Sequence, residues 1–310
     1  MDAPVTVVGE ALIDIVIPLD GQVAEYVGGS PANVAIGLAR LGHQVELATH
    51  LGRDQRGDRI AALLATEEVT LAPGSTTAVR TSTAAARLDE TGAASYTFDL
   101  DWQVDPALPV ADGGHLHTGS IAAVLPPGGA DVHAIVEAAR PHATISYDPN
   151  ARPSLMGSAA GARAVVESLV ALADVVKASD EDLHWLYPGV PVEEVLRGWT
   201  ARGPRLVAAT QGGSEVVVLF GDEVHRIPTR SVAVVDTVGA GDSFMSGLIS
   251  GLLDAGLLGG TAARARLATA GWDEVSSAVE RAVVCSAITV SRAGANPPTR
   301  GELELAAVAD

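Results

Sequence analysis

Residues 234 to 244 read Val-Val-Asp-Thr-Val-Gly-Ala-Gly-Asp-Ser-Phe, and this stretch decides how the rest of the chain is interpreted. The β-branched residues Val232, Val234 and Val235 predict a buried strand, the glycines predict a sharp turn, and the apolar run from Phe244 to Leu253 predicts a helix. This order is typical of a phosphate site, because the unpaired N–H groups and the dipole of a helix start attract an anion.

Asp242 lies in the first turn of that expected helix, and two interpretations of it stay open. As a helix cap, its carboxylate is favoured by the helix dipole; as a general base, it takes a proton beside a phosphate bound by the same turn. Spacing alone favours the cap. In either case Gly247 and Gly251 predict that the helix packs closely against a neighbour.

Composition excludes several classes of protein. The 310 residues carry a formal net charge of −18, and the sequence has no run of Lys and Arg, which argues against nucleic acid as a partner. The single cysteine, Cys285, excludes an internal disulfide and a thiolate metal cluster. The N-terminus lacks the pattern of a signal peptide, and no apolar run reaches the ~20 residues of a membrane span. We therefore expect a cytoplasmic protein with no nucleic-acid or membrane partner.

Strand and helix patterns alternate along most of the chain, which predicts a mostly parallel sheet covered by helices on both faces. We expect strands at 5–8, 11–16, 45–49, 144–147, 175–177, 205–210 and a strand pair across 215–227. Residues 28–42 open with two glycines and continue as an expected helix, with Ser30 as N-cap, Pro31 as its first residue and Gly42 closing it. Further helices are expected at 59–65, 129–140, 158–172, 191–201 and 273–291.

The segment 81–98 interrupts this rhythm, because two alternating strands flank the turn residues 89–92. Together with residues 12–28, this hairpin predicts a small separate sheet. One face of such a sheet is apolar, so it closes over a ligand or pairs with a second subunit.

Several polar groups lie at strand ends and helix starts. Asp14 interrupts an apolar strand, and Asn33 lies in a first helical turn; each fits either a structural role or a ligand contact. Asp148 to Pro153 follow a strand where open α/β sheets bind ligands, and Ser179 to Asp182 fit a capped helix start. His115 and His117 fit a strand-end turn, with a metal site as the alternative.

Three families of motif compete for the 234–244 stretch. A dinucleotide fingerprint needs a third glycine where Phe244 stands, and a P-loop needs a lysine where Asp242 stands. A serine hydrolase needs a base, yet His225 is the last histidine and no nucleophile elbow occurs. What remains is phosphoryl transfer to a hydroxyl, in which the helix start stabilises charge and Asp242 accepts the proton.

Residues 235–244 resemble the C-terminal signature of the ribokinase-like (pfkB-type) carbohydrate kinases, and residues 28–42 are similar to their N-terminal signature. The resemblance implies an α/β fold, a three-layer α/β/α ribokinase-like sandwich in which residues 1–310 form a single kinase domain. It also implies lid strands at approximately 12–28 and 81–101, with a homodimer formed through the lid. The implied cofactors are ATP and Mg²⁺, with a monovalent cation such as K⁺ as a further candidate.

The same resemblance assigns roles to individual residues. It implies Asp242 as the catalytic base and an anion hole at Gly239, Ala240 and Gly241. The implied sugar ligands are Asp14, Gly28, Gly29, Asn33 and Arg152, and the implied ATP ligands are Lys177, Thr210, Gly212, Gly213 and Asn296. Arg152 and Lys177 also fit surface salt bridges. Asp182 takes the place of the glutamate in the family's Asn-x-x-Glu motif and, being shorter, is expected to reach Mg²⁺ through water.

Residues 9–14 and 148–153 look most similar to fructokinases, so phosphorylation of fructose at a primary hydroxyl is the leading interpretation. Ser30-Pro31 replaces the Lys-Gly usual in ribokinases, and the low aromatic content disfavours a stacked nucleobase. Activity as a 2-keto-3-deoxygluconate kinase, a ribokinase or a nucleoside kinase stays open. A nucleotide-binding oxidoreductase and a non-catalytic sugar-binding regulator are remote alternatives.

Overall fold

The computed structural model describes residues 3–18, 22–88 and 94–308. Its centre is a nine-stranded sheet made of β1 (Val5–Val8), β4 (Val45–Ala48), β5 (Val69–Leu71), β8 (His115–Gly119), β9 (Thr144–Asp148), β10 (Val175–Ser179), β11 (Leu206–Gln211), β12 (Glu215–Phe220) and β13 (Glu223–Pro228). The strand order is β13-β12-β11-β10-β9-β8-β1-β4-β5. All neighbouring strands from β5 to β11 pair in parallel. Strand β12 pairs antiparallel with β11, and β13 pairs antiparallel with β12.

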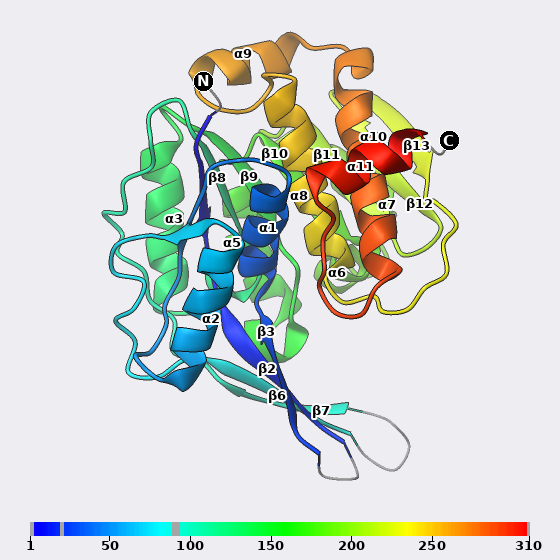
Figure 1. The fold of residues 1–310 in the computed structure, drawn as a ribbon. Helices are drawn as coiled ribbons and strands as arrows, with labels where there is room; N and C mark the ends of the chain where they lie inside the picture. Colours follow the sequence, from blue (N-terminus) through cyan, green and yellow to red (C-terminus); the bar gives the residue numbers. More distant parts are fainter. Residues whose placement is uncertain (1–2, 19–21, 89–93, 309–310) are drawn as a thin grey trace.

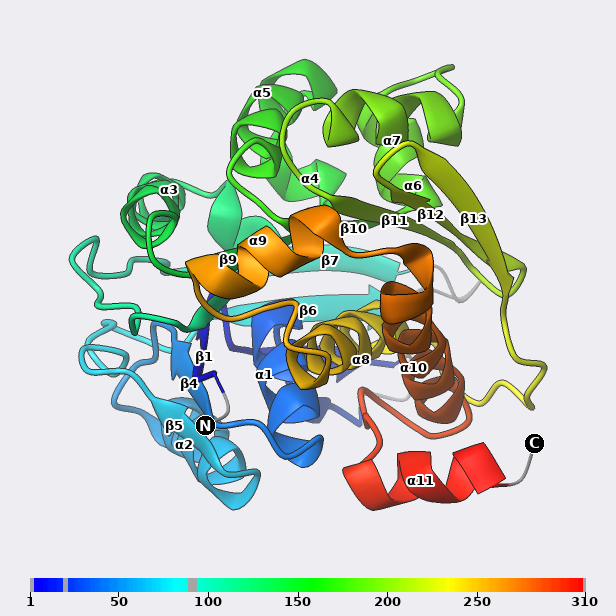
Figure 2. The same cartoon turned by 90° about the horizontal axis from the view of Figure 1, so that it is seen from above.

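Helices cover both faces of this sheet (Figures 1 and 2). One face carries α1 (Ser30–Arg40), α2 (Gln55–Thr66), α8 (Ala240–Asp254) and α10 (Trp272–Val290), and the other carries α3 (Gly128–Ala139), α5 (Ala159–Val170), α6 (Asp180–Leu186) and α7 (Val192–Thr200). Side chains alternate between two cores: Val216 and Val218 of β12 join the first, and Val217 and Leu219 join the second. The three-layer α/β/α prediction is confirmed.

Helices α8 and α10 form the tightest helix pair on the first face. A Cβ atom built on Gly251 would lie 2.5 Å from the Cα of Ala278, and one on Gly247 would lie 2.9 Å from the Cα of Ala282. Only glycine permits this approach, which confirms the close packing predicted from the two glycines. The start of α8 is thereby fixed against a long buried helix.

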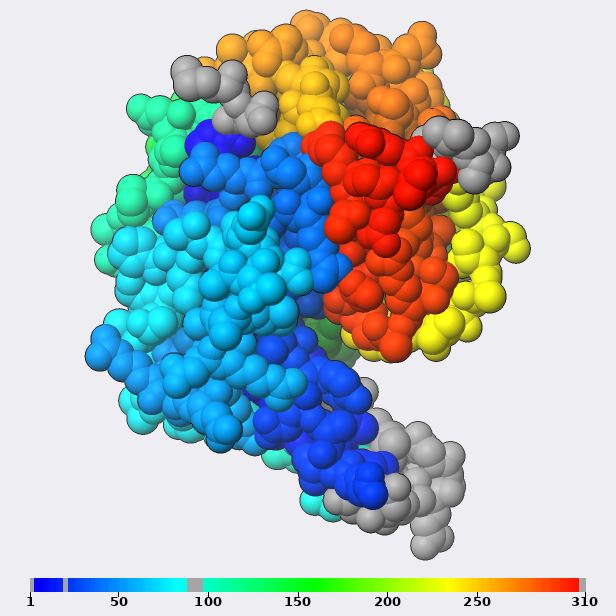
Figure 3. Space-filling model, viewed as in Figure 1, coloured from blue at the N-terminus to red at the C-terminus, as the bar shows by residue number. Residues whose placement is uncertain are grey.

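A second sheet projects from the main body as the lid (Figures 1 and 3). It contains β2 (Leu12–Ile17), β3 (Ala24–Gly28), β6 (Thr83–Leu88) and β7 (Ala94–Asp99) in the order β3-β2-β6-β7. Strands β2 and β6 are parallel, and the two outer pairs are antiparallel. The prediction of a small separate sheet is confirmed, although its turn at residues 89–92 lies outside the described residues.

The prediction of a buried strand at Val232 to Val235 is wrong. This segment is an extended loop, and Val234 and Val235 are 65% and 63% exposed. The loop leaves β13 at the outer edge of the sheet and must return to the middle of the sheet, where α8 begins. β-branched residues favour a pleated, half-buried surface, and on this path no neighbouring strand supplies one.

Helix starts and short elements account for the other differences. Gly29, not Ser30, is the N-cap of α1, and α2 begins at residue 55 because Asp54 accepts a hydrogen bond from the N–H of Gly57. Four short helices, together with strand β5, were not predicted: η1 (Ile121–Ala123), α4 (Pro153–Met156), α9 (Thr261–Thr269) and α11 (Arg300–Val308).

The two histidines of β8 are interior hydrogen-bonding groups. His115 Nε2 and His117 Nδ1 lie 2.8 and 3.0 Å from the hydroxyl of Ser146, and both rings are buried. Burial lowers the pKa of each histidine to about 3, so both are neutral at physiological pH. They lie within β8 rather than in the strand-end turn that we expected.

Across residues 3–18, 22–88 and 94–308, no helix has the length and apolar character needed to cross a bilayer.

Candidate active site

A pocket of about 580 Å³ lies at the carboxyl ends of the parallel strands, beneath the lid. Its wall includes residues in or just after the carboxyl ends of β1, β8, β9, β10 and β11, and the starts of α1 and α8. Four residues of the lid strands, Leu12, Asp14, Ala84 and Phe98, complete it. Chain segments that are more than two hundred residues apart therefore meet in one cavity. This is the position in which open α/β sheets place ligands.

The start of α8 forms one side of the pocket. Gly239 is the N-cap in a left-handed conformation, with φ of 75°, and a Cβ atom there would lie 2.5 Å from the Cβ of Ala295. Both facts require glycine. Within the described residues, the N–H groups of Gly241 and Asp242 have no hydrogen-bond acceptor, and no side chain caps the helix. The helix start therefore presents unpaired donors to the pocket.

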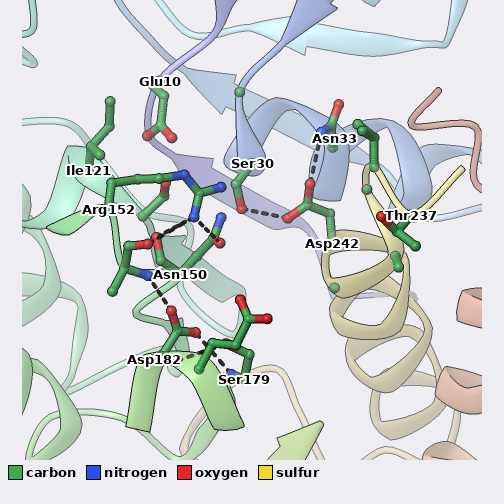
Figure 4. Close-up of a pocket in the computed structure, with 18 of the residues that line it drawn as sticks. Glu10, Ser30, Asn33, Ile121, Asn150, Arg152, Ser179, Asp182, Thr237 and Asp242 are labelled. Carbon is green, nitrogen blue, oxygen red and sulfur yellow. Dashed lines mark hydrogen bonds between the residues drawn. The ribbon is translucent and has the colours of Figure 1, made fainter. Parts of the chain in front are cut away.

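Two side chains of α1 hydrogen-bond to the carboxylate of Asp242 (Figure 4). Its Oδ1 accepts a hydrogen bond of 2.6 Å from the hydroxyl of Ser30, and its Oδ2 accepts one of 2.8 Å from Nδ2 of Asn33. Both donors belong to the first turn of α1. Asp242 is only 9% exposed and makes no hydrogen bond to the start of its own helix. Its carboxylate is thus held in one orientation inside the pocket, and it is not a hydrogen-bonding cap.

A buried ion pair lies beneath the start of α8. Lys177 Nζ is 2.7 Å from Oδ2 of Asp148, and both side chains are almost inaccessible to solvent. Burial lowers the pKa of Lys177, but Asp148 and the neighbouring carboxylates raise it more strongly, so the ammonium stays charged. Burial raises the pKa of Asp148 to about 6 despite the opposing effect of Lys177. A Cβ atom on Gly241 would lie 3.0 Å from Lys177 Nζ, which places this cation directly below the helix start.

The far end of the pocket carries Asp14, Arg152 and their neighbours. Burial raises the pKa of Asp14, and the guanidinium of Arg152 lowers it in part. A Cβ atom on Gly28 would lie 2.0 Å from Oδ2 of Asp14, so Gly28 leaves room for that carboxylate without itself lining the pocket. Arg152 is exposed, and its Nη1 donates to Oδ1 of Asn150 over 2.9 Å.

The acidic group at residues 180–182 reaches the pocket from α6. Asp182 forms a capping box with Ser179: Oδ2 accepts from the N–H of Ser179, and Oδ1 accepts from the N–H of Ala151 over 2.7 Å. Each carboxylate oxygen keeps a second lone pair for a water molecule. Among the described residues no group of three or more His, Cys, Asp or Glu side chains could hold a metal ion.

The structure brings most of the residues expected to bind ligands together on the pocket wall. These are Asp14, Gly29, Asn33, Arg152, Lys177, Asp182, Thr210, Gly212, Gly239, Ala240, Gly241 and Asp242. Three residues lie off that wall: Gly28, Gly213 and Asn296. The side chain of Asn296 accepts a hydrogen bond of 2.6 Å from Nη1 of Arg40.

Sequence reasoning did not assign a site role to Ser30 or Glu10. The hydroxyl of Ser30 was interpreted as a helix cap, and no local signal connects it to a carboxylate 212 positions away. Glu10 follows the first strand and lines the pocket, but a single acid after a glycine is a weak signal. Its position directly after a parallel strand is the feature that indicates a place near the ligand.

The model of the pfkB family of carbohydrate kinases matches residues 2–300 of this chain. The chain belongs to that family. The resemblance inferred from the two signatures and the ribokinase-like fold are thereby confirmed, and the protein is a phosphotransferase that acts on a carbohydrate hydroxyl.

The similar proteins include bacterial fructokinases. The chain is 34% identical over 266 residues to a fructokinase of Klebsiella pneumoniae, an alignment that covers 83% of this chain and 87% of the relative. It is 32% identical over 316 residues to a fructokinase of Escherichia coli, with 98% and 99% covered. A solved double-mutant fructokinase of Vibrio cholerae with fructose, ADP and potassium bound superimposes with a TM-score of 0.80 at 28% identity, covering 98% and 99% of the two chains.

Proposed function

We propose that this chain transfers the γ-phosphoryl group of ATP to a primary hydroxyl of a small sugar, and that the sugar is fructose. One observation carries the proposal: Asp242 lies in a pocket beside unpaired helix N–H groups, with its carboxylate held by two donors from α1. A base for a hydroxyl and donors for a phosphoryl group thus share one site. The similarity to fructokinases, one of them solved with fructose and ADP, supports fructose as the acceptor.

In the proposed mechanism Asp242 accepts the proton of the attacking hydroxyl. A carboxylate oxygen has two lone pairs, so the hydroxyl can bind Asp242 while Ser30 and Asn33 keep their hydrogen bonds. The N–H groups of Gly241 and Asp242 stabilise negative charge on the transferred group, and the ammonium of Lys177 adds positive charge below them.

The remaining ligands divide between the two ends of the pocket. Asp14, Gly29 and Arg152 bind sugar hydroxyls at the lid end, and Gly28 makes room for Asp14. Thr210 and Gly212 line the nucleotide end. Gly213 and Asn296 were also expected to bind ATP; they lie off the pocket wall, and their roles stay predictions.

The residues present fit a magnesium ion that is held mainly by ATP. Mg²⁺ usually keeps several waters and binds through phosphates and one or two carboxylates. Asp182, with Asp180 and Glu181 beside it on the wall, would hold such waters. Bound there, Mg²⁺ would neutralise charge on the β- and γ-phosphates. Potassium in the solved relative is a reason to include K⁺ in the assays.

A sugar acid such as 2-keto-3-deoxygluconate is the second candidate acceptor. Arg152 places an exposed guanidinium at the sugar end of the pocket, and arginine binds carboxylates well. Fructose offers no carboxylate to this group. Comparing the two acceptors therefore tests what Arg152 binds.

The experiment measures ADP release by the purified protein with ATP, Mg²⁺ and K⁺. The acceptors are fructose, glucose, ribose, 2-keto-3-deoxygluconate and adenosine, each assayed alone. We expect the highest kcat/KM with fructose. A preference for the sugar acid would replace fructose by the second candidate, and an absence of turnover with every acceptor would refute the kinase proposal.

We also propose that two copies pair through their lids. The outer lid strand β3 exposes Tyr26, which is 57% accessible, and the neighbouring Val23 is equally exposed. A four-stranded sheet with apolar side chains on a free surface gains stability by covering them. Light scattering at several concentrations tests the dimer, with Tyr26→Lys expected to give monomers; a wild-type monomer would contradict the proposal.

A further inference from the structure

Glu10 is a buried carboxyl that the proposed mechanism does not use. It connects β1 to β2, is 5% exposed and lines the pocket. Its Oε2 accepts a hydrogen bond of 3.2 Å from the N–H of Ala122, and the hydroxyl of Ser120 also hydrogen-bonds to its carboxyl group. Glu10 therefore binds both ends of a three-residue turn, Ser120 to Ala122.

The first residue of that turn, Ser120, has a strained backbone conformation. Ser120 has φ of 57° and ψ of −153°, a combination that is essentially restricted to glycine. Such a conformation persists only where its surroundings hold it. Here the N–H of Ser120 donates to the carbonyl of Asp148 over 2.9 Å, and Glu10 binds the hydroxyl.

The middle residue of the turn, Ile121, forms part of the pocket wall. In Figure 4 it lies at the same end of the pocket as Glu10 and Arg152. The turn is also held from behind, because Nε1 of Trp102 donates to the carbonyl of Ala122 over 2.9 Å. Trp102 is buried against the start of α3, where a Cβ atom on Gly128 would lie 2.5 Å from the indole nitrogen.

We propose that Glu10 is a positioning residue that locks the strained turn 120–122, so that Ile121 sets the size of the sugar subsite and selects a hexose over a smaller pentose. The inference rests on the proposed sugar-kinase function and deepens it. Ile121 supplies an apolar surface of fixed position, and a strained backbone held at both ends resists displacement by a poorly fitting sugar. The hydrogen bonds of Glu10 go to the turn and not to Asp242, so in this proposal it acts on sugar fit and not on proton transfer.

The test compares Glu10→Ala, Glu10→Gln, Ile121→Ala and the wild type with fructose and ribose as acceptors. Loss of a hydrogen-bonding carboxyl is expected to raise the KM for fructose about tenfold, while kcat at saturating fructose changes less than about threefold. Preference for fructose over ribose is expected to fall about tenfold in Glu10→Ala and in Ile121→Ala. Glu10→Gln keeps an oxygen that can accept from Ala122 and is expected to recover most of the preference.

Glu194→Ala, an exposed acid on α7, is the matched control and is expected to leave both constants unchanged. If Glu10→Ala does not fold, Ile121→Ala decides the matter. Unchanged fructose preference in Ile121→Ala, or a loss of kcat with unchanged KM in the Glu10 variants, overturns this inference and leaves the kinase proposal intact. Absence of turnover by the wild type overturns both.

Discussion

The hydroxyl of Ser30, in the first turn of α1, donates a hydrogen bond of 2.6 Å to Oδ1 of Asp242, in the first turn of α8. Two helix starts that are 212 positions apart in the sequence thus meet at the proposed base. Hydrogen bonds of this kind fix the orientation of the carboxylate. The N-terminal signature of the chain therefore supports the base that the C-terminal signature supplies.

Ser30→Ala is expected to lower kcat with fructose and ATP by roughly 10- to 100-fold, the equivalent of one hydrogen bond to a charged group. The KM for ATP is expected to stay within about threefold of the wild type, because the α8 start is untouched. Ser158→Ala removes a serine that caps α5 and is the matched control. Wild-type kcat in Ser30→Ala would show that Asn33 alone holds the carboxylate.

Gly239→Ala tests the geometry of the α8 start. The added methyl group would lie 2.5 Å from the Cβ of Ala295 on a backbone with φ of 75°, so the turn must move. We expect a KM for ATP at least ~10-fold higher and a loss of stability of about 1 kcal/mol or more. Gly74→Ala also has positive φ but meets open space, and it controls for backbone strain alone. Equal ATP affinity in the two variants would contradict a role for the turn in binding phosphate.

Lys177 can be a phosphate ligand or only the partner of Asp148, and a double variant separates these roles. Lys177→Met leaves a buried carboxyl without its cation, and we expect a loss of about 3–5 kcal/mol. Adding Asp148→Asn removes the unpaired acid and is expected to restore much of that stability. If the refolded double variant binds ATP as tightly as the wild type, measured by calorimetry, Lys177 serves only the fold.

Acid is expected to destabilise the protein through its buried histidines. The pKa values of His115 and His117 are lowered from 6.5 to about 3 in the folded state, so the unfolded chain binds more protons between these values. Their contribution to stability is complete above pH 6.5 and declines as the pH falls towards 3. Glu10 and Asp148, with pKa values raised to about 7 and about 6, act in the opposite direction over narrower intervals.

Between pH 7 and 5 the two acids largely offset the two histidines, whereas below pH 5 the histidines outweigh them, so the thermal unfolding midpoint should fall when the pH is lowered from 5 to 3. His117→Gln, whose amide can still reach Ser146, is expected to reduce this fall. A midpoint that rises on acidification would mean that the two acids outweigh the histidines. Differential scanning calorimetry at constant ionic strength measures this midpoint at each pH for the wild type and the variant.

Local patterns were sufficient to predict much of the fold. Alternating strands and helices predicted the layered sheet, and the change of pattern at residues 81–98 predicted the lid. The glycines at 247 and 251 predicted the α8 packing, because a missing side chain has one geometric consequence. The sequence also contains a capping-box pattern at the start of α11, where Thr299 and Glu302 hydrogen-bond to each other.

The site was harder to derive, because its contacts join distant parts of the chain. Spacing suggested Asp242 as a cap, whereas the structure gives its two oxygens to Ser30 and Asn33. The valines before Asp236 looked like a strand, since β-propensity does not report whether a neighbouring strand is present. Glu10 acquires its partners only when η1 folds beside the first strand. These features depend on tertiary contacts, which no local window contains.

The central claim is that Asp242 removes the proton of the sugar hydroxyl, and the turnover of Asp242→Asn tests it most directly. The substitution keeps the size of the side chain and leaves the backbone donors of the α8 start in place. With ATP, Mg²⁺ and fructose we expect kcat to fall at least ~10²-fold while calorimetry shows ATP binding within about threefold of the wild type. A variant that binds ATP and keeps near wild-type kcat would contradict the claim and make Asp242 a structural residue of the helix start.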